Sequence, residues 1–188
     1  MTRHWLYLLP VMVLSVANAV TGVTPQDSTD ALRAKADQGD PISQFELGSA
    51  YETGLHGLPQ DGVEAARWYR LAAEQELVLA QYRLGLLYAN GASRFGHAEG
   101  VRWLRLAADQ GLADAQYNLG LMHADGRGVP KDDVTAHMWF NLAASGATGE
   151  GQNQAAENRD MIAERLSSNQ RAEAQRLARE WNEAHPRD

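Results

Sequence analysis

The sequence predicts an all-α solenoid in which pairs of helices stack one after another, and two observations predict it. Five markers recur together about every 35 residues. They are Leu47-Gly48, Leu84-Gly85 and Leu119-Gly120; Trp68, Trp103 and Trp139; Ala72-Ala73, Ala107-Ala108 and Ala143-Ala144; Gln44, Gln81 and Gln116; and Gly54, Gly91 and Gly126. Within each repeat, apolar residues follow the period of a helix. Because one pair of short helices buries too little apolar surface to be stable alone, the pairs must stack on their neighbours.

Residues 1–19 are predicted to be a secretory signal peptide. Arg3 and His4 form a short basic start, residues 5–16 are an apolar run, and Ala17-Asn18-Ala19 is a small-residue cleavage pattern. We therefore expect cleavage after Ala19 and a periplasmic or secreted protein. An uncleaved amphiphilic anchor is the alternative, although the run is shorter than the roughly 20 apolar residues of a membrane span. No membrane span is expected after cleavage, and residues 20–27 are expected to be flexible.

The solenoid is predicted over residues 28–146 and begins with a half repeat, residues 28–39. Residues 32–39 copy residues 104–111 at a shift of 72 positions, so the half repeat is a lone second helix. Ser28 or Asp27 is available as its N-cap.

Three full repeats follow at about 41–76, 77–111 and 112–146, each made of two helices. In the second repeat, Ala80, Leu84, Leu87 and Tyr88 lie on one face of the first helix, and Gly91 ends it. The second helix is predicted over residues 99–110. A glycine inside a helix costs about 1 kcal/mol, so the central Leu-Gly pairs predict a close approach of another helix at Gly85 and its equivalents.

Residues 147–188 are predicted to be two capping helices. The first is expected over residues 154–166. Ser167 and Gln170 fit a capping box that opens a second helix, which ends at about Glu183. Because its apolar residues cover one side only, we expect this pair to close the core with a charged outer face.

The repeats resemble Sel1-like repeats, which are relatives of tetratricopeptide repeats. The third repeat carries the resemblance best, in residues 115–120, 126–132, 136–139 and 142–144. It departs from the pattern at His123, where the family has tyrosine. The resemblance covers roughly residues 32–146. It implies a right-handed α/α solenoid that acts as an interaction scaffold, with the first helices lining a concave surface for a protein or peptide.

Composition excludes several classes of function. The formal net charge of −7 argues against a nucleic-acid partner, which requires a basic face. The chain has no cysteine, so it forms no disulfide and no thiolate metal site. No nucleophile motif or phosphate-binding glycine loop is present, so we expect no enzyme activity and no cofactor. His123 and His137 lack further ligands at metal-binding spacing, so we expect no metal site.

Six residues at two equivalent positions of the first helices are candidates for partner binding. They are the aromatic residues Phe45, Tyr82 and Tyr117, and the glutamines Gln44, Gln81 and Gln116. Tyr82 lies about 170° around the helix from the packed face. The aromatic rings therefore either form a ladder on the inner wall or fill the seam with an adjacent helix. The glutamines either bind the backbone of a partner, or are solvated, or tie adjacent repeats together.

These observations predict a non-catalytic protein-protein interaction scaffold of the bacterial cell envelope. The alternative is a module that binds an envelope polymer such as peptidoglycan or a polysaccharide, or a hydrolase acting on a related ligand.

Overall fold

The structure is a computed structural model that describes residues 25–91 and 96–186. The predicted signal peptide and residues 20–24 lie outside the described residues. The described chain is helical: α2 (Pro25–Asp37), α3 (Pro41–Thr53), α4 (Gly62–Glu74), α5 (Val78–Ala89), α6 (Gly96–Asp109), α7 (Ala113–Asp125), α8 (Asp133–Gly146), α9 (Gly149–Ala163) and α10 (Ser168–Ala184). None of these described helices is long and apolar enough to cross a membrane.

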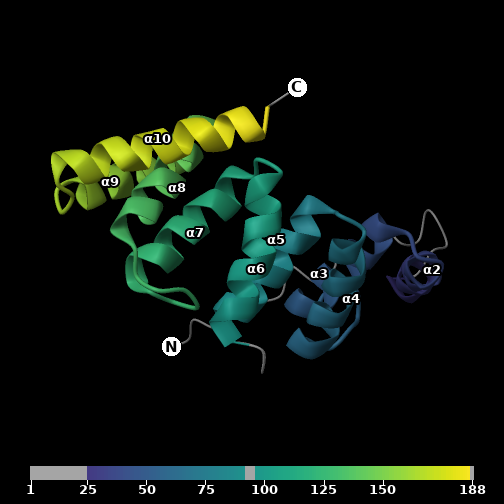
Figure 1. The fold of residues 1–188 in the computed structure, drawn as a ribbon. Coiled ribbons are helices and arrows are strands. Elements are labelled where there is room, and N and C mark those ends of the chain that lie inside the picture. Colours follow the sequence, from purple (N-terminus) through teal and green to yellow (C-terminus); the bar gives the residue numbers. More distant parts are fainter. Residues whose placement is uncertain (1–24, 92–95, 187–188) are drawn as a thin grey trace, which may run out of the picture.

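The helices form the predicted repeat solenoid. Helices α3 and α4, α5 and α6, and α7 and α8 pack as pairs, and the second helix of each pair packs on the first helix of the next. Figure 1 shows the pairs following one another from α2 at one end to α9 and α10 at the other. The fold class predicted from the repeats is confirmed.

Helix ends follow from local sequence. The carboxylates of Asp40, Asp61 and Asp132 accept hydrogen bonds from backbone N–H groups in the first turns of α3, α4 and α8. Gly54 and Gly126 end α3 and α7 in the left-handed conformation, with φ of +71° at both.

The markers of the repeat form the core. Leu47, Leu84, Leu119 and Trp139 are fully buried, and Trp68 and Trp103 are almost so. A Cβ atom on Gly85 would lie 2.8 Å from Leu104 Cγ and 3.0 Å from its backbone nitrogen. Gly48 and Gly120 face Tyr69 and Phe140 equally closely. The glycines therefore let the two helices of each pair approach each other, as predicted.

Several helix boundaries differ from the sequence prediction. Helix α2 begins at Pro25, so Asp27 and Ser28 lie inside the helix and are not its N-cap, and residues 25–27 are helical where flexible chain was expected. The reason is that proline at a first helical position loses no hydrogen bond. Helix α6 begins at Gly96 and α9 at Gly149, three and five residues before the predicted starts.

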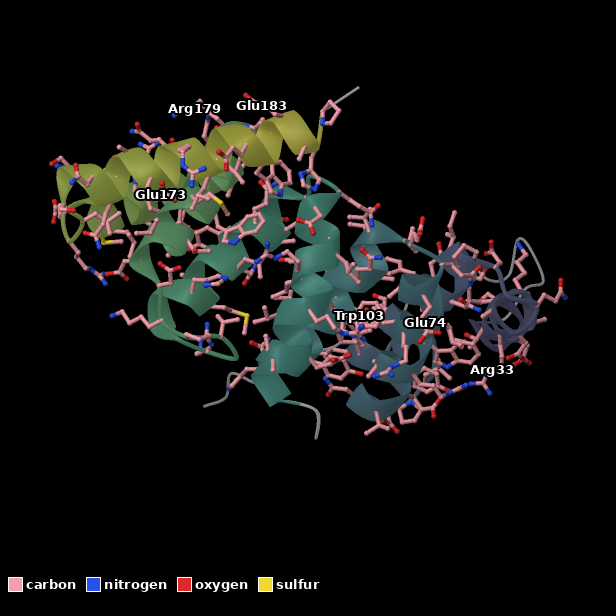
Figure 2. The ribbon with its side chains drawn as sticks, in the orientation of Figure 1. Arg33, Glu74, Trp103, Glu173, Arg179 and Glu183 are labelled. Carbon is pink, nitrogen blue, oxygen red and sulfur yellow. The ribbon has the colours of Figure 1, made fainter. Side chains whose placement is uncertain are left out.

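The C-terminal helices do not pack as a hairpin. Both α9 and α10 pack against α8 and make little contact with each other, and in Figure 1 α10 lies across the end of the stack. The predicted capping box of Ser167 and Gln170 is confirmed. Trp181 of α10 packs edge-on against Trp139 of α8, with ring centroids 6.1 Å apart. The outer face is charged as predicted: Arg176 pairs with Glu173 and Glu180, and Arg179 and Glu183 point away from the stack (Figure 2).

Candidate protein-binding face

The three candidate aromatic residues are half-buried on successive first helices. The Phe45 ring lies 5.5 Å from the ring of Tyr69, and the Tyr117 ring lies 5.6 Å from that of Phe140. Tyr82 packs against the core cluster that contains Leu104 and Leu119. The rings therefore enter the seam between helices and expose only part of their surface.

Hydroxyl groups link this row from one repeat to the next. Tyr117 Oη accepts a hydrogen bond of 2.9 Å from Asn158 Nδ2 of α9. Tyr82 Oη accepts a longer one, 3.5 Å, from Asn118 Nδ2 of α7. Phe45 of α3 has no hydroxyl group, so this link is missing at the junction between α3 and α5.

A charged group forms the link at that junction. Glu52 Oε2 of α3 accepts hydrogen bonds from Arg83 Nη2 of α5, at 2.6 Å, and from Tyr69 Oη of α4, at 2.7 Å. Burial raises the pKa of Tyr69 to about 12, and the adjacent Glu52 carboxylate adds to this rise. Tyr69 is therefore a neutral hydrogen-bond donor at physiological pH. Sequence reasoning missed this group, because no motif spacing marks residues 31 positions apart.

The three candidate glutamines are buried and bonded inside the protein. Their Nε2 groups donate to backbone oxygens of the preceding second helix: Gln44 to Ala36, Gln81 to Ala73 and Gln116 to Ala108, at 3.1–3.2 Å. These bonds tie adjacent repeats, which was one of the three interpretations. The glutamines form no part of the surface described next.

Exposed apolar side chains stand beside the aromatic row. Ile42 and Leu79 occupy equivalent positions at the starts of α3 and α5, and they are 59% and 50% exposed. We use the name first-helix face for the surface of α3, α5 and α7 made by Ile42, Phe45, Glu46, Leu79, Tyr82, Arg83, Asp114, Tyr117 and Asn118. A cavity of about 450 Å³ lies at its N-terminal end, lined by Phe45, Glu46, Ser49 and Thr53 together with Leu32 of α2.

The histidines do not assemble a metal centre. Within the described ranges, no group of three or more histidine, aspartate or glutamate side chains is placed to hold a metal ion. Both ring nitrogens of His123 and Nδ1 of His137 are buried and have no hydrogen-bond partner among the described residues. Burial lowers the pKa of both side chains, so they are neutral at pH 7.

These features define a helical-repeat protein. Comparison with protein families identifies it further: the Sel1 repeat family matches residues 41–77, 78–112 and 113–147. The chain therefore belongs to the Sel1 repeat family. Sel1-repeat proteins generally mediate protein-protein interactions. A comparison with curated protein sequences gave no match.

Two solved structures are similar to this one. A Sel1 repeat protein from Oxalobacter formigenes is 38% identical, with a TM-score of 0.57, and the match covers 68% of this chain and 96% of that one. The second is c5321, a protective antigen of uropathogenic Escherichia coli strains with an SLR fold. It is 24% identical, with a TM-score of 0.53, and the match covers 92% of this chain but only 44% of that longer protein. The second likeness concerns the fold alone.

Proposed function

We propose that the protein is a non-catalytic scaffold of the bacterial cell envelope and that it binds a protein or peptide on the first-helix face, the predicted concave face. One observation carries this proposal: successive first helices place large apolar and aromatic side chains at equivalent, partly exposed positions. Exposed apolar surface rimmed by polar groups is typical of protein-binding sites. A periplasmic or secreted location is part of the proposal and rests on the signal peptide predicted in residues 1–19.

The mixture of residues on this face suits a peptide. Ile42, Leu79 and the exposed edges of the aromatic rings offer apolar contact, and aromatic side chains lose little rotamer freedom on binding. Glu46, Arg83 and Asp114 supply charges of both signs beside them. The cavity at Phe45 and Glu46 is a hollow into which one partner side chain fits. Charged groups at the rim of a binding site, such as these three side chains, set the orientation of the partner and the association rate more than the affinity.

Affinity capture from the cell envelope tests the proposal with a matched pair of variants. Leu79→Asp places a charge on the first-helix face, whereas Leu106→Asp changes a leucine of similar exposure, 40%, on the second helix α6. We expect crosslinking capture of envelope proteins by the wild type and by Leu106→Asp, and its loss in Leu79→Asp while the thermal melt stays unchanged. Equal capture by both variants would contradict the proposed face.

The same preparation tests the alternative function. Binding of the wild type to purified sacculi, lost in a folded Tyr82→Ala/Tyr117→Ala variant, would favour a polymer-binding module over a protein scaffold.

A further inference from the structure

An arginine and a tyrosine join successive helices at two of the three repeat junctions. Arg33 Nη2 of α2 donates to Tyr51 Oη of α3 at 2.6 Å, and Arg70 Nη2 of α4 donates to Tyr88 Oη of α5 at 2.5 Å. Each tyrosine lies four residues after the leucine of the Leu-Gly pair. The third repeat has His123 at this position.

The third junction does not replace the lost bond. Arg105 of α6 is the equivalent arginine, and its guanidinium lies over the Trp139 ring, 4.8 Å from the centroid. Neither ring nitrogen of His123 has a hydrogen-bond partner among the described residues. Burial lowers the pKa of His123 and the charge of Arg105 lowers it further, whereas Asp132 in the turn before α8 opposes the shift. A proton added to this ring would therefore be buried beside a like charge.

A second buried histidine lies in the same repeat. His137 of α8 is 5% exposed, and its Nδ1 atom has no hydrogen-bond partner within the described ranges. The charged groups that act on it are Arg159 and Asp160 of α9 and Arg171 of α10. Burial and the two arginines disfavour the protonated ring, and only Asp160 favours it.

The first two repeats have no titratable pair of this kind. Ala66 and Val101 occupy the position of His137, two residues before the tryptophan of each repeat. Tyrosine occupies the position of His123, and tyrosine does not titrate between pH 5 and 8. Acidification in this range therefore acts on the core of the third repeat and spares the equivalent core positions of the other two.

Opening of the third repeat would expose both rings to water and let them bind protons. A histidine that is protonated only in the open form raises the equilibrium constant for opening by at most about 30-fold at pH 5.0 and hardly at all at pH 7.5. The stability of a repeat stack is a sum of local contributions, so one end can open while the rest stays folded.

We propose that the third repeat is an acid-sensitive segment: below about pH 6, α7 and α8 loosen together with α9 and α10, while α3, α4 and α5 stay folded. Helix α10 belongs to the segment because its Trp181 packs on Trp139. The hydrogen bond of 3.2 Å from Trp181 Nε1 to Asp109 Oδ1 of α6 would break as the segment opens. Tyr117 packs on Phe140 of α8, so opening would also change one end of the first-helix face. The proposal does not depend on the function of that face.

Amide hydrogen exchange resolved by helix tests the proposal. Mass spectrometry of peptic fragments gives the opening constant of each helix at pH 7.5 and pH 5.0, after correction for the intrinsic exchange rate at each pH. We expect the constants of α7, α8 and α10 to rise at least about fivefold at pH 5.0, and those of α3 and α5 to change by less than about twofold. An equal change in all helices, or none, would overturn the proposal.

The second repeat supplies the variants that test the cause. His123→Tyr and His137→Val introduce its residues, and we expect the double variant to lose the selective opening at pH 5.0. His97→Ala is the matched control, because it removes an exposed histidine of α6 and should leave the wild-type response. The same selective opening in the double variant would show that these histidines are not the cause. If the double variant does not fold, the two single variants decide, and each should reduce the response.

Discussion

The two ends of the solenoid close the same kind of stack in different ways. At the N-terminal end, α2 copies α6, but Lys35 stands where α6 buries Ala107, and Lys35 is exposed. At the C-terminal end, Met138 and Leu142 of α8 are buried where α6 exposes Arg102 and Leu106. Arg33 of α2 and the charged side chains of α10 lie at opposite ends of the molecule (Figure 2).

This difference shows two solutions to the problem of an unpaired end. Helix α2, at the N-terminal end, carries polar residues on its free face, so no further helix is needed to cover that face. The last repeat keeps an apolar face, and α10 covers it through a cluster that joins Met138, Trp139 and Leu142 to Ala178 and Trp181. The apolar outer face of α8 therefore depends on α10 for cover, whereas the polar free face of α2 does not require a further helix.

Removal of α10 should have the largest effect. A chain that ends at Leu166 exposes Met138, Trp139 and Leu142, and burial of each such side chain contributes about 1.5–3 kcal/mol. We expect a loss of more than about 4 kcal/mol in the free energy of unfolding, together with self-association. Thermal unfolding and size-exclusion chromatography measure both. Arg176→Ala in the full chain is the control and should leave the melt unchanged, because its ion pairs are exposed. An unchanged melt of the shortened chain would mean that the two ends are alike.

Trp103→Ala tests how much packing in the interior of the stack, between the two ends, contributes to stability. Trp103 is 4% exposed and donates from Nε1 to Glu99 at 3.0 Å. Truncation of a large core side chain costs about 3–5 kcal/mol, and chemical denaturation measures this value. A loss no larger than that of a surface substitution would show that Trp103 is not part of the core.

Gly85→Val tests the close helix approach inside one repeat. The new side chain would meet Leu104, including its backbone, which has little room to move. We expect a loss of about 1–3 kcal/mol from overpacking, measured in the same denaturation experiment. Gly62→Ala is the control, because a Cβ atom there meets nothing within 4 Å. If both variants were equally stable, the central glycine would not be required for packing.

The smallest expected effect is on the pH dependence of stability at the C-terminal end, which α10 covers. Burial lowers the pKa of His137 below its ordinary value near 6.5; Arg159 lowers it further, and Asp160 opposes the shift. Just below pH 6.5, His137 therefore binds more protons in the unfolded chain than in the folded one. The contribution of His137 to stability is constant above that pH and falls as the pH decreases. His137→Gln should make the fall in melting temperature between pH 7.5 and 5.5 shallower. An identical fall in both proteins would exclude this contribution.

Much of the fold could be predicted because each repeat meets neighbours that are copies of itself. Leu84 and Trp103 recur with the same spacing as their equivalents, so periodicity alone indicates their burial. The capping box at Ser167 could be predicted because it joins residues three positions apart. The candidate site was predicted less completely: the aromatic row was found, but a helical wheel cannot show how much of Tyr82 the next repeat covers.

The amino-acid sequence by itself determined the number of repeats, the pairing of helices within them and the positions of most turns, because these depend on contacts within one repeat or between adjacent ones. Only the tertiary structure decided that α10 crosses α8 without pairing with α9, that Glu52 joins Tyr69 and Arg83, and that no described residue donates to the Gln116 oxygen. These features depend on residues far apart in the chain, such as Asp109 and Trp181, which lie 72 positions apart. Side-chain packing, which no repeat period encodes, brings them together.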